Sequence, residues 1–204
     1  MAVVAGATAV EGGGDRPQRR RIVAAAIELT ARSGWSAVTM ARLADAVGVS
    51  RQTVYNEIGS KPALAEAMVL DELGRFLSVV SRAFDDHPDD LVEAVRWAVR
   101  GVLELAEDNA LLHAIVSATH GAETDLLPLL TTHADSLLGA AKGLVRERLA
   151  SYSVPLGARE LDTVVDLVVR VVLSHAMQPS GTPERTADDV AWVVARVLEP
   201  PAER

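Results

Sequence analysis

The sequence predicts an all-α protein with about nine helices. Half of its residues are apolar, at 49%, and they recur at the three- and four-residue spacing of helices, with no alternating strand pattern of useful length. Glycine, proline, aspartate and asparagine gather at a few joints between these segments. A chain of 204 residues can hold one small and one larger core. We therefore expect a small helical domain at residues 15–62 and a larger one at residues 63–204.

The first fourteen residues differ from the rest. Residues 1–14 are small and glycine-rich, without the basic start and apolar run of a secretory signal, so we expect a flexible tail. No later apolar stretch approaches the roughly 18 residues of a membrane-spanning helix. The chain has no cysteine, which excludes disulfides and thiolate metal sites and agrees with a reducing compartment. We expect a cytoplasmic protein.

Two short helices around a tight turn form the most specific pattern, within residues 34–61. Thr39 can cap the first helix and Gly48 supplies its left-handed end. Ser50 can cap the second helix, with Val49 and Val54 forming a hydrophobic staple across its start. The first helix buries four apolar residues at helical spacing, namely Met40, Leu43, Ala44 and Val47. This is the pattern of a helix-turn-helix, which reads DNA in the major groove.

The second helix presents a polar face suited to DNA. Arg51 can form two hydrogen bonds with guanine, and Gln52 or Asn56 can do so with adenine. Hydroxyls and Lys61, at the start of the next helix behind Ser60, can hold phosphates. The predicted DNA-binding residues are Thr39, Arg42, Arg51, Gln52, Thr53, Tyr55, Asn56 and Lys61. Glu57 counts against DNA contact, and an ordinary helical corner with a solvated face is the alternative.

This region resembles the DNA-binding domain of the TetR family of bacterial transcriptional regulators, across about residues 16–65. The resemblance is carried by Ser33-Gly34-Trp35, the Thr39 start, Ala44-x-x-x-Gly48-Val49-Ser50, Thr53-Val54-Tyr55 and Ser60-Lys61. It implies phosphate contacts for Tyr55 and Lys61. Ile58, where the family usually has an aromatic residue, and Pro62, where it usually has an acidic or polar one, depart from the pattern. Neither should abolish the fold.

Charge is divided unevenly along the chain. Residues 15–62 carry eight basic and four acidic side chains, a net charge of +4, so a total of −8 leaves −12 for the remainder. A local basic field suits DNA even in an acidic protein. The arginines within residues 16–21 have two interpretations, a contact with phosphates or the minor groove, or a solvated helix start.

The larger domain is expected to enclose a ligand pocket. A helix from Lys61 to Phe84 would link it to the DNA-binding domain, and one from Asp89 to Glu107, with a single polar stripe, would be central and buried. Apolar ligand contacts are predicted from Trp97, Val116, Leu127 and Leu130, and polar contacts from His113, Thr119, His120 and His133. A filled core is the alternative. We predict no cofactor and no metal, because His113, His120, Glu123, Asp125 and His133 lack compact ligand spacing.

The last two helices, from Ala158 to Met177 and from Pro183 to Leu198, are the expected homodimer interface, where the resemblance also places it. Apolar residues cover more than half of the first helix, and Trp192 projects from the polar side of the second. The predicted interface residues are Leu161, Val164, Val165, Val168, Val172 and Trp192. On the last helix, Val190, Val193, Val194 and Val197 are expected to face inward.

The predicted function is a ligand-responsive transcriptional regulator and not an enzyme. A dimer would bind double-stranded DNA at a near-palindromic operator, most simply as a repressor released by a largely apolar small molecule. The alternatives are a helical enzyme or metal-binding protein that uses the core cavity, and a ligand-binding protein that no longer recognises DNA. We find no nucleophile elbow, phosphate loop or metal motif that supports the enzyme.

Overall fold

The computed structural model describes residues 17–113 and 127–199, with side chains for all of these except residues 127–135. The described part contains helices and no strands, which confirms the all-α prediction. The helices are α1 (Pro17–Ser33), α2 (Met40–Val47), α3 (Arg51–Ile58), α4 (Lys61–Asp86), α5 (Leu91–Glu107), α7 (Leu127–Leu149), α8 (Ala158–Met177) and α9 (Pro183–Leu198), with a short 3₁₀ helix at Trp35–Ala37. None of them is both long and apolar enough to cross a membrane.

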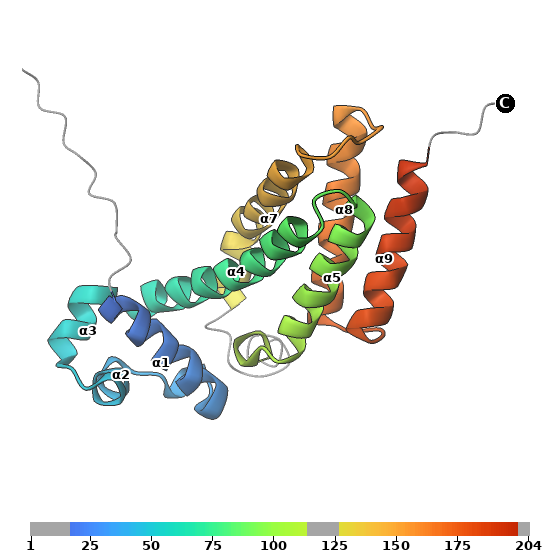
Figure 1. Cartoon of the computed structure of the whole chain (residues 1–204). Coiled ribbons are helices and arrows are strands. Elements are labelled where there is room, and N and C mark those ends of the chain that lie inside the picture. Colours follow the sequence, from blue (N-terminus) through green and yellow to red (C-terminus); the bar gives the residue numbers. More distant parts are fainter. Residues whose placement is uncertain (1–16, 114–126, 200–204) are drawn as a thin grey trace, which may run out of the picture.

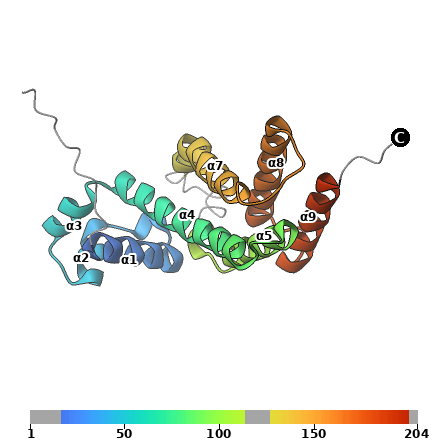
Figure 2. The same ribbon diagram turned by 45° about the horizontal axis from the view of Figure 1, so that its top comes forward.

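Helix α4 connects two groups of helices. Helices α1 to α3 gather around the start of α4, whereas α5, α7, α8 and α9 surround its other end (Figure 1, Figure 2). The first group has its own apolar core, in which Ile22, Leu43, Val54 and Leu64 are fully buried. This core continues along α4 to Met68, and the boundary between residues 62 and 63 stays a prediction.

The predicted helix ends around the turn are confirmed. The hydroxyls of Thr39, Ser50 and Ser60 each accept a hydrogen bond from the backbone N–H three residues later, at 3.2, 3.0 and 3.3 Å. Gly48 ends α2 with φ 72° and ψ 41°, a left-handed conformation that glycine adopts without steric cost. Local sequence therefore specifies the entry and exit of both helices.

Helix α5 is central, as predicted, and packs closely against α4. Its buried side is built from small residues, among them Ala94, Ala98 and Ala106. A Cβ atom on Gly101 would lie only 2.6 Å from Val79 Cγ1 of α4. The glycine therefore permits the close approach of these two helices.

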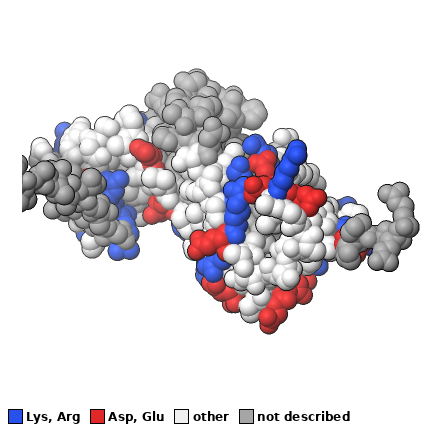
Figure 3. All heavy atoms as spheres, turned by 90° about the horizontal axis from the view of Figure 1, so that it is seen from above, with Lys and Arg blue, Asp and Glu red and all other residues white. Residues whose placement is uncertain are grey.

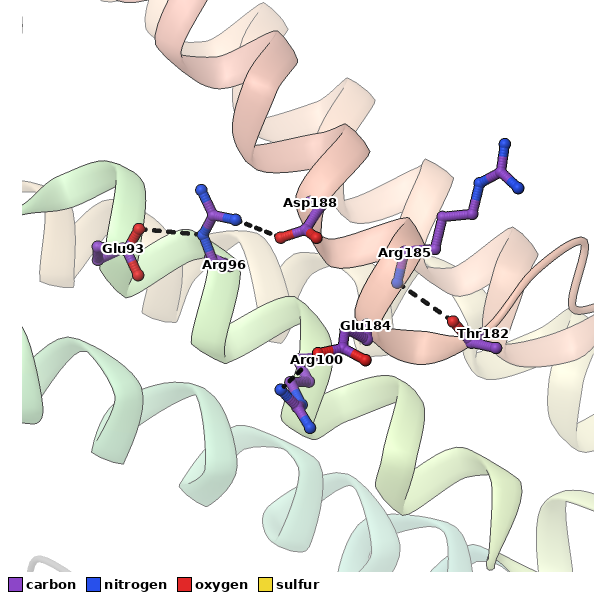
Figure 4. A network of polar contacts seen from close by, with 7 residues as sticks. All are labelled: Glu93, Arg96, Arg100, Thr182, Glu184, Arg185 and Asp188. Carbon is purple, nitrogen blue, oxygen red and sulfur yellow. Dashed lines mark hydrogen bonds and ion pairs between the residues drawn. The ribbon is translucent and has the colours of Figure 1, made fainter.

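The polar stripe of α5 faces α9 at the surface. Figure 4 shows Arg96 paired with Asp188, and Arg100 beside Glu184, to which it donates at 3.5 Å. Because these side chains are partly exposed, each pair adds little stability. The pairs fix the register between two helices whose apolar sides already pack together.

Two polar contacts hold α7 and the loop behind it in place. The Tyr152 hydroxyl donates to the carbonyl oxygen of His87 at 2.7 Å, which ties the α7–α8 loop to the end of α4. Burial raises the pKa of Tyr152. Asp166 of α8 accepts from Lys142 of α7 and from Arg170, and these hydrogen bonds lower the pKa of Asp166.

Candidate DNA-binding face and ligand cavity

The polar face of α3 is exposed, as expected. Val54 and Ile58 point into the core, whereas Arg51, Gln52, Tyr55 and Asn56 lie on the surface. Tyr55 is 50% exposed although it is large and aromatic. The Gln52 amide donates to Asn56 Oδ1 at 2.9 Å, so the two predicted adenine contacts act on one another in the free protein.

The other predicted DNA contacts have partners within the protein. Arg42 donates to the Ala37 carbonyl at 2.8 Å, and the Thr53 hydroxyl lies 2.9 Å from that of Ser50. Lys61 donates to the Trp35 carbonyl at 3.1 Å, with its ammonium 4.7 Å from the centroid of the Trp35 ring. A phosphate would have to replace or share this contact of Lys61.

Two arginines of α1 hold the helix-turn-helix from behind. Arg19 donates to the Glu57 carbonyl at 2.7 Å, and Arg21 donates to the Val47 carbonyl at 3.0 Å. These carbonyls lie in the last turns of α3 and α2, where unpaired oxygens and the helix dipole favour a cation. The sequence predicts only DNA contact or solvation for these arginines. Their partners depend on how α1 packs, for which the sequence has no local signal.

Charge along the sequence is net positive only around the helix-turn-helix, at +4 for residues 15–62. Seen from above, basic side chains lie at the DNA-binding end, and on the larger bundle basic and acidic side chains lie among one another (Figure 3). Exposed charges of one sign raise the local concentration of an oppositely charged partner. The net positive charge therefore makes the helix-turn-helix end a better site for DNA than the rest of this acidic chain.

The larger group of helices encloses an apolar cavity of about 500 Å³. Its wall comes mainly from α4, α5, α7 and α8, with residues of α9 as well, and includes Phe76, Leu77, Val95, Leu138 and Val168. Among the described residues that line it, only Glu72 and Asn109 are polar. Cavities of this size and character hold small molecules. Neither polar residue was predicted from the sequence, because neither stands in a motif.

The predicted ligand contacts need correction at Trp97 and His113. Trp97 does not line the cavity: it is 47% exposed, stacks on His87 with ring centroids 6.1 Å apart, and has Arg100 over its ring. Trp97 lies four residues from Glu93 and three from Arg100, so its spacing already placed it on the polar stripe. His113 lines a separate hollow of about 350 Å³ between the ends of α5 and α8.

The remaining predicted ligand contacts cannot be located. Val116, Thr119 and His120 lie outside the described residues, as do the side chains of Leu127, Leu130 and His133. Glu123 and Asp125, weighed as metal ligands, also lie outside them. Within the described part of the chain, no three histidine, aspartate or glutamate side chains form a group that could hold a metal ion.

The predicted interface residues of α8 face the interior of the chain's own fold. Val165 and Val172 are buried, Leu161 and Val168 pack against the cores, and Val164 lines the cavity. A cavity wall needs apolar residues beyond those of a filled core, which explains the wide apolar face of α8. The exposed large apolar residues of these two helices are Leu167, Val171 and Leu173 on α8 and Val193, Val197 and the predicted Trp192 on α9. Val193 and Val197 therefore point outward, contrary to expectation.

Comparisons with known proteins agree with this architecture. Residues 22–68 match the family model of bacterial regulatory proteins of the tetR family, and residues 90–196 match that of the C-terminal domain of the bacterial tetracycline repressor. The HTH-type transcriptional regulator AlkX of Mycobacterium tuberculosis is 30% identical over 187 residues, which cover 91% of this chain and 85% of the relative.

Two solved structures show the same fold over almost the whole chain. The TetR family repressor AlkX from Dietzia sp., implicated in biodegradation of n-alkanes, is 28% identical, with a TM-score of 0.70 and coverage of 92% of this chain and 97% of that one. The multidrug binding protein EbrR, solved with imidazole, is 19% identical, with a TM-score of 0.58 and coverage of 93% and 99%. The two family models and the relative in Mycobacterium tuberculosis establish what the helix-turn-helix residues indicated: the chain belongs to the TetR family of bacterial transcriptional regulators.

Proposed function

We propose that this regulator is a dimeric repressor in the cytoplasm, which leaves its operator when an apolar small molecule fills the cavity. The family consists of ligand-responsive DNA-binding regulators and not of enzymes. One observation carries the coupling between the two sites. Helix α4 begins beside the DNA-binding face at Lys61, and its later turns, from Val69 to Phe84, line the cavity. A ligand that displaces these turns moves the helix on which α1 to α3 pack.

In this proposal α3 lies in the major groove. Arg51, Gln52 and Asn56 contact base edges, because guanidinium and amide groups match the paired donors and acceptors of guanine and adenine. The hydroxyl and basic residues bind phosphates and set the position of the protein on DNA. These phosphate contacts are Thr39, Arg42, Thr53, Tyr55 and Lys61.

The dimer would place two such helices roughly 34 to 36 Å apart on a near-palindromic operator. Its interface is assigned to the exposed apolar residues of α8 and α9, headed by Leu167 and Trp192, at 58% and 62% exposure. Large exposed apolar side chains of this kind favour a protein interface. The two helices lie next to one another in both views (Figure 1, Figure 2).

The ligand is assigned to the cavity between α4, α5, α7 and α8. The nearly complete apolar lining supports an apolar molecule, since burying apolar surface drives such binding. The relative from Dietzia sp. is described as implicated in biodegradation of n-alkanes, which agrees with a ligand of this character. Ligand binding releases DNA only to the extent that the ligand prefers the conformation that binds DNA poorly.

The test is fluorescence anisotropy with DNA from upstream of the protein's own gene, at fixed salt and with scrambled DNA as competitor. We expect two chains per operator. Tyr55→Phe and Lys61→Ala should weaken binding to all sequences, whereas Gln52→Ala should relax the preference at one base pair by about 1 to 3 kcal/mol. Lys142→Ala is the matched control, because Lys142 lies on α7 away from the DNA-binding face. If selection from randomised DNA also returns no preferred site, the regulator has lost DNA recognition and the proposal is wrong.

A further inference from the structure

Among the described residues, one polar pair interrupts the apolar wall of the cavity. Glu72 of α4 and Asn109, just beyond α5, are each 6% exposed and both line the cavity. The Asn109 amide donates to Glu72 Oε2 at 2.7 Å, and Arg75 donates to Glu72 Oε1 at 2.9 Å. Asn109 Oδ1 in turn accepts from the backbone N–H of Leu112 at 2.7 Å. Both carboxylate oxygens of Glu72, and the amide nitrogen and oxygen of Asn109, therefore each have a hydrogen-bond partner.

A carboxylate in such a wall is costly. Burying a charge costs free energy even when it is paired, and an apolar side chain of similar volume would pack at least as well. The neighbouring cavity-lining residues on α4, Val69, Leu73 and Phe76, are all apolar. The position of Glu72 is therefore explained better by a molecule that it recognises than by the packing of α4.

The chemistry of the pair selects one kind of group. An ionised carboxylate only accepts hydrogen bonds, and each of its oxygens has room for a second donor. Beside it, the Asn109 amide keeps a second N–H donor and a second acceptor lone pair, because its hydrogen bonds to Glu72 and to the Leu112 N–H use one of each. A second carboxylate at this point would be repelled by Glu72, and the guanidinium of Arg75, 2.9 Å from Glu72 Oε1, offsets only part of that repulsion.

We propose that Glu72 and Asn109 form the head-group site of the cavity, and that the ligand is an elongated apolar molecule ending in a neutral hydrogen-bond donor, as in an aliphatic alcohol. This inference rests on the proposed function in taking the cavity as the ligand site. The head group donates to Glu72 while its chain lies along the apolar wall. Because Glu72 stands one turn beyond Met68, the last α4 residue of the N-terminal core, the ligand touches the linking helix directly.

The test compares three probes of similar chain length by isothermal titration calorimetry of the full chain. The probes are decanol, its methyl ether, which lacks the donor, and decanoate, which carries a charge. We expect decanol to bind the wild-type protein about 10-fold more tightly than either of the others, the factor of one hydrogen bond to a charged group. This comparison needs no variant, so it does not depend on how a substitution affects folding.

Variants then locate the preference. Glu72→Gln should remove most of the 10-fold discrimination against decanoate, since the amide has no charge. Asn109→Ser, which keeps an oxygen for the Leu112 N–H, should weaken decanol more than the ether. Glu66→Gln is the matched control, because Glu66 is exposed on the same helix, and it should leave all three affinities unchanged. Circular dichroism confirms that each variant is folded.

Operator binding, measured in parallel, separates the two proposals. Equal affinity for the three probes, or a preference for decanoate, overturns the head-group site but leaves an apolar-ligand regulator intact. If no probe binds while operator binding persists, both the head-group site and the apolar ligand are wrong. If decanol is preferred but no operator binds, the head-group site stands and the repressor proposal fails.

Discussion

The two ends of α4 lie in opposite surroundings. Leu64 and Met68, in its first two turns, are almost completely buried in the closed core of the DNA-binding group. Phe76 and Leu77, only a few turns later, are half-buried and border the cavity. One helix thus belongs to a tightly packed unit and to an open one. Close packing therefore surrounds the part of α4 that supports the DNA-binding face, and unfilled volume surrounds the part that borders the cavity.

The largest test of this comparison pairs two leucines of the same helix. We expect Leu64→Ala to lower the free energy of unfolding by about 2 to 5 kcal/mol, because it leaves a cavity in a closed core. Leu77→Ala should cost less than about 2 kcal/mol, since Leu77 already borders empty space and loses fewer contacts. Urea unfolding followed by circular dichroism measures both. Equal losses of unfolding free energy for the two variants would mean that the space beside Leu77 is filled in solution.

A second test concerns the crossing of α4 and α5. Gly101→Ala should destabilise the protein by about 1 to 3 kcal/mol, because the new methyl group meets Val79 Cγ1 at a distance that requires the Val79 side chain or one of the helices to shift. Gly74→Ala is the matched control, since nothing lies within 4 Å of a Cβ atom at this helical position. It should stabilise by about 0.5 to 1 kcal/mol.

The close crossing also predicts how Gly101→Ala combines with a second substitution, at Val79. Val79→Ala removes the methyl group that a Cβ atom on Gly101 would meet, so it should recover part of the loss in a double-mutant cycle. Strict additivity of Gly101→Ala and Val79→Ala would show that the helices do not approach one another this closely.

The same contrast decides what the sequence could predict. The caps at Thr39 and Ser50 and the turn at Gly48 depend on residues within one helical turn, so they were predicted and are confirmed. The boundaries of α8 and α9 were predicted residue by residue for a similar reason, with Gly157 and Thr182 before their first turns. Adjacent residues determine local hydrogen bonds and backbone conformation, so helix ends can be predicted from the sequence.

It was harder to predict which residues of a helix face inward than where the helix begins and ends. The apolar pattern of α8 predicted Val165, and not Leu167, as an interface residue. In the structure Val165 is buried within the fold, whereas Leu167 is exposed. The cavity itself follows from how four helices fail to fill a space, which no single segment encodes. Glu72 and Asn109 are separated by 37 residues, so their meeting depends on the fold.

The smallest expected loss of operator affinity is at Arg19 of α1, and its salt dependence distinguishes a contact within the protein from a contact with phosphate. Arg19 holds the last turn of α3 through the Glu57 carbonyl, so Arg19→Gln should weaken operator binding by roughly 1 kcal/mol, the net value of a partly exposed hydrogen bond. Since Arg19 then acts on the protein and not on phosphate, the slope of log K against log salt should stay unchanged. Lys61→Ala, which removes a proposed phosphate contact, should reduce that slope by about 1. A reduced slope in Arg19→Gln would instead assign this arginine to DNA and return α1 to the phosphate-binding surface.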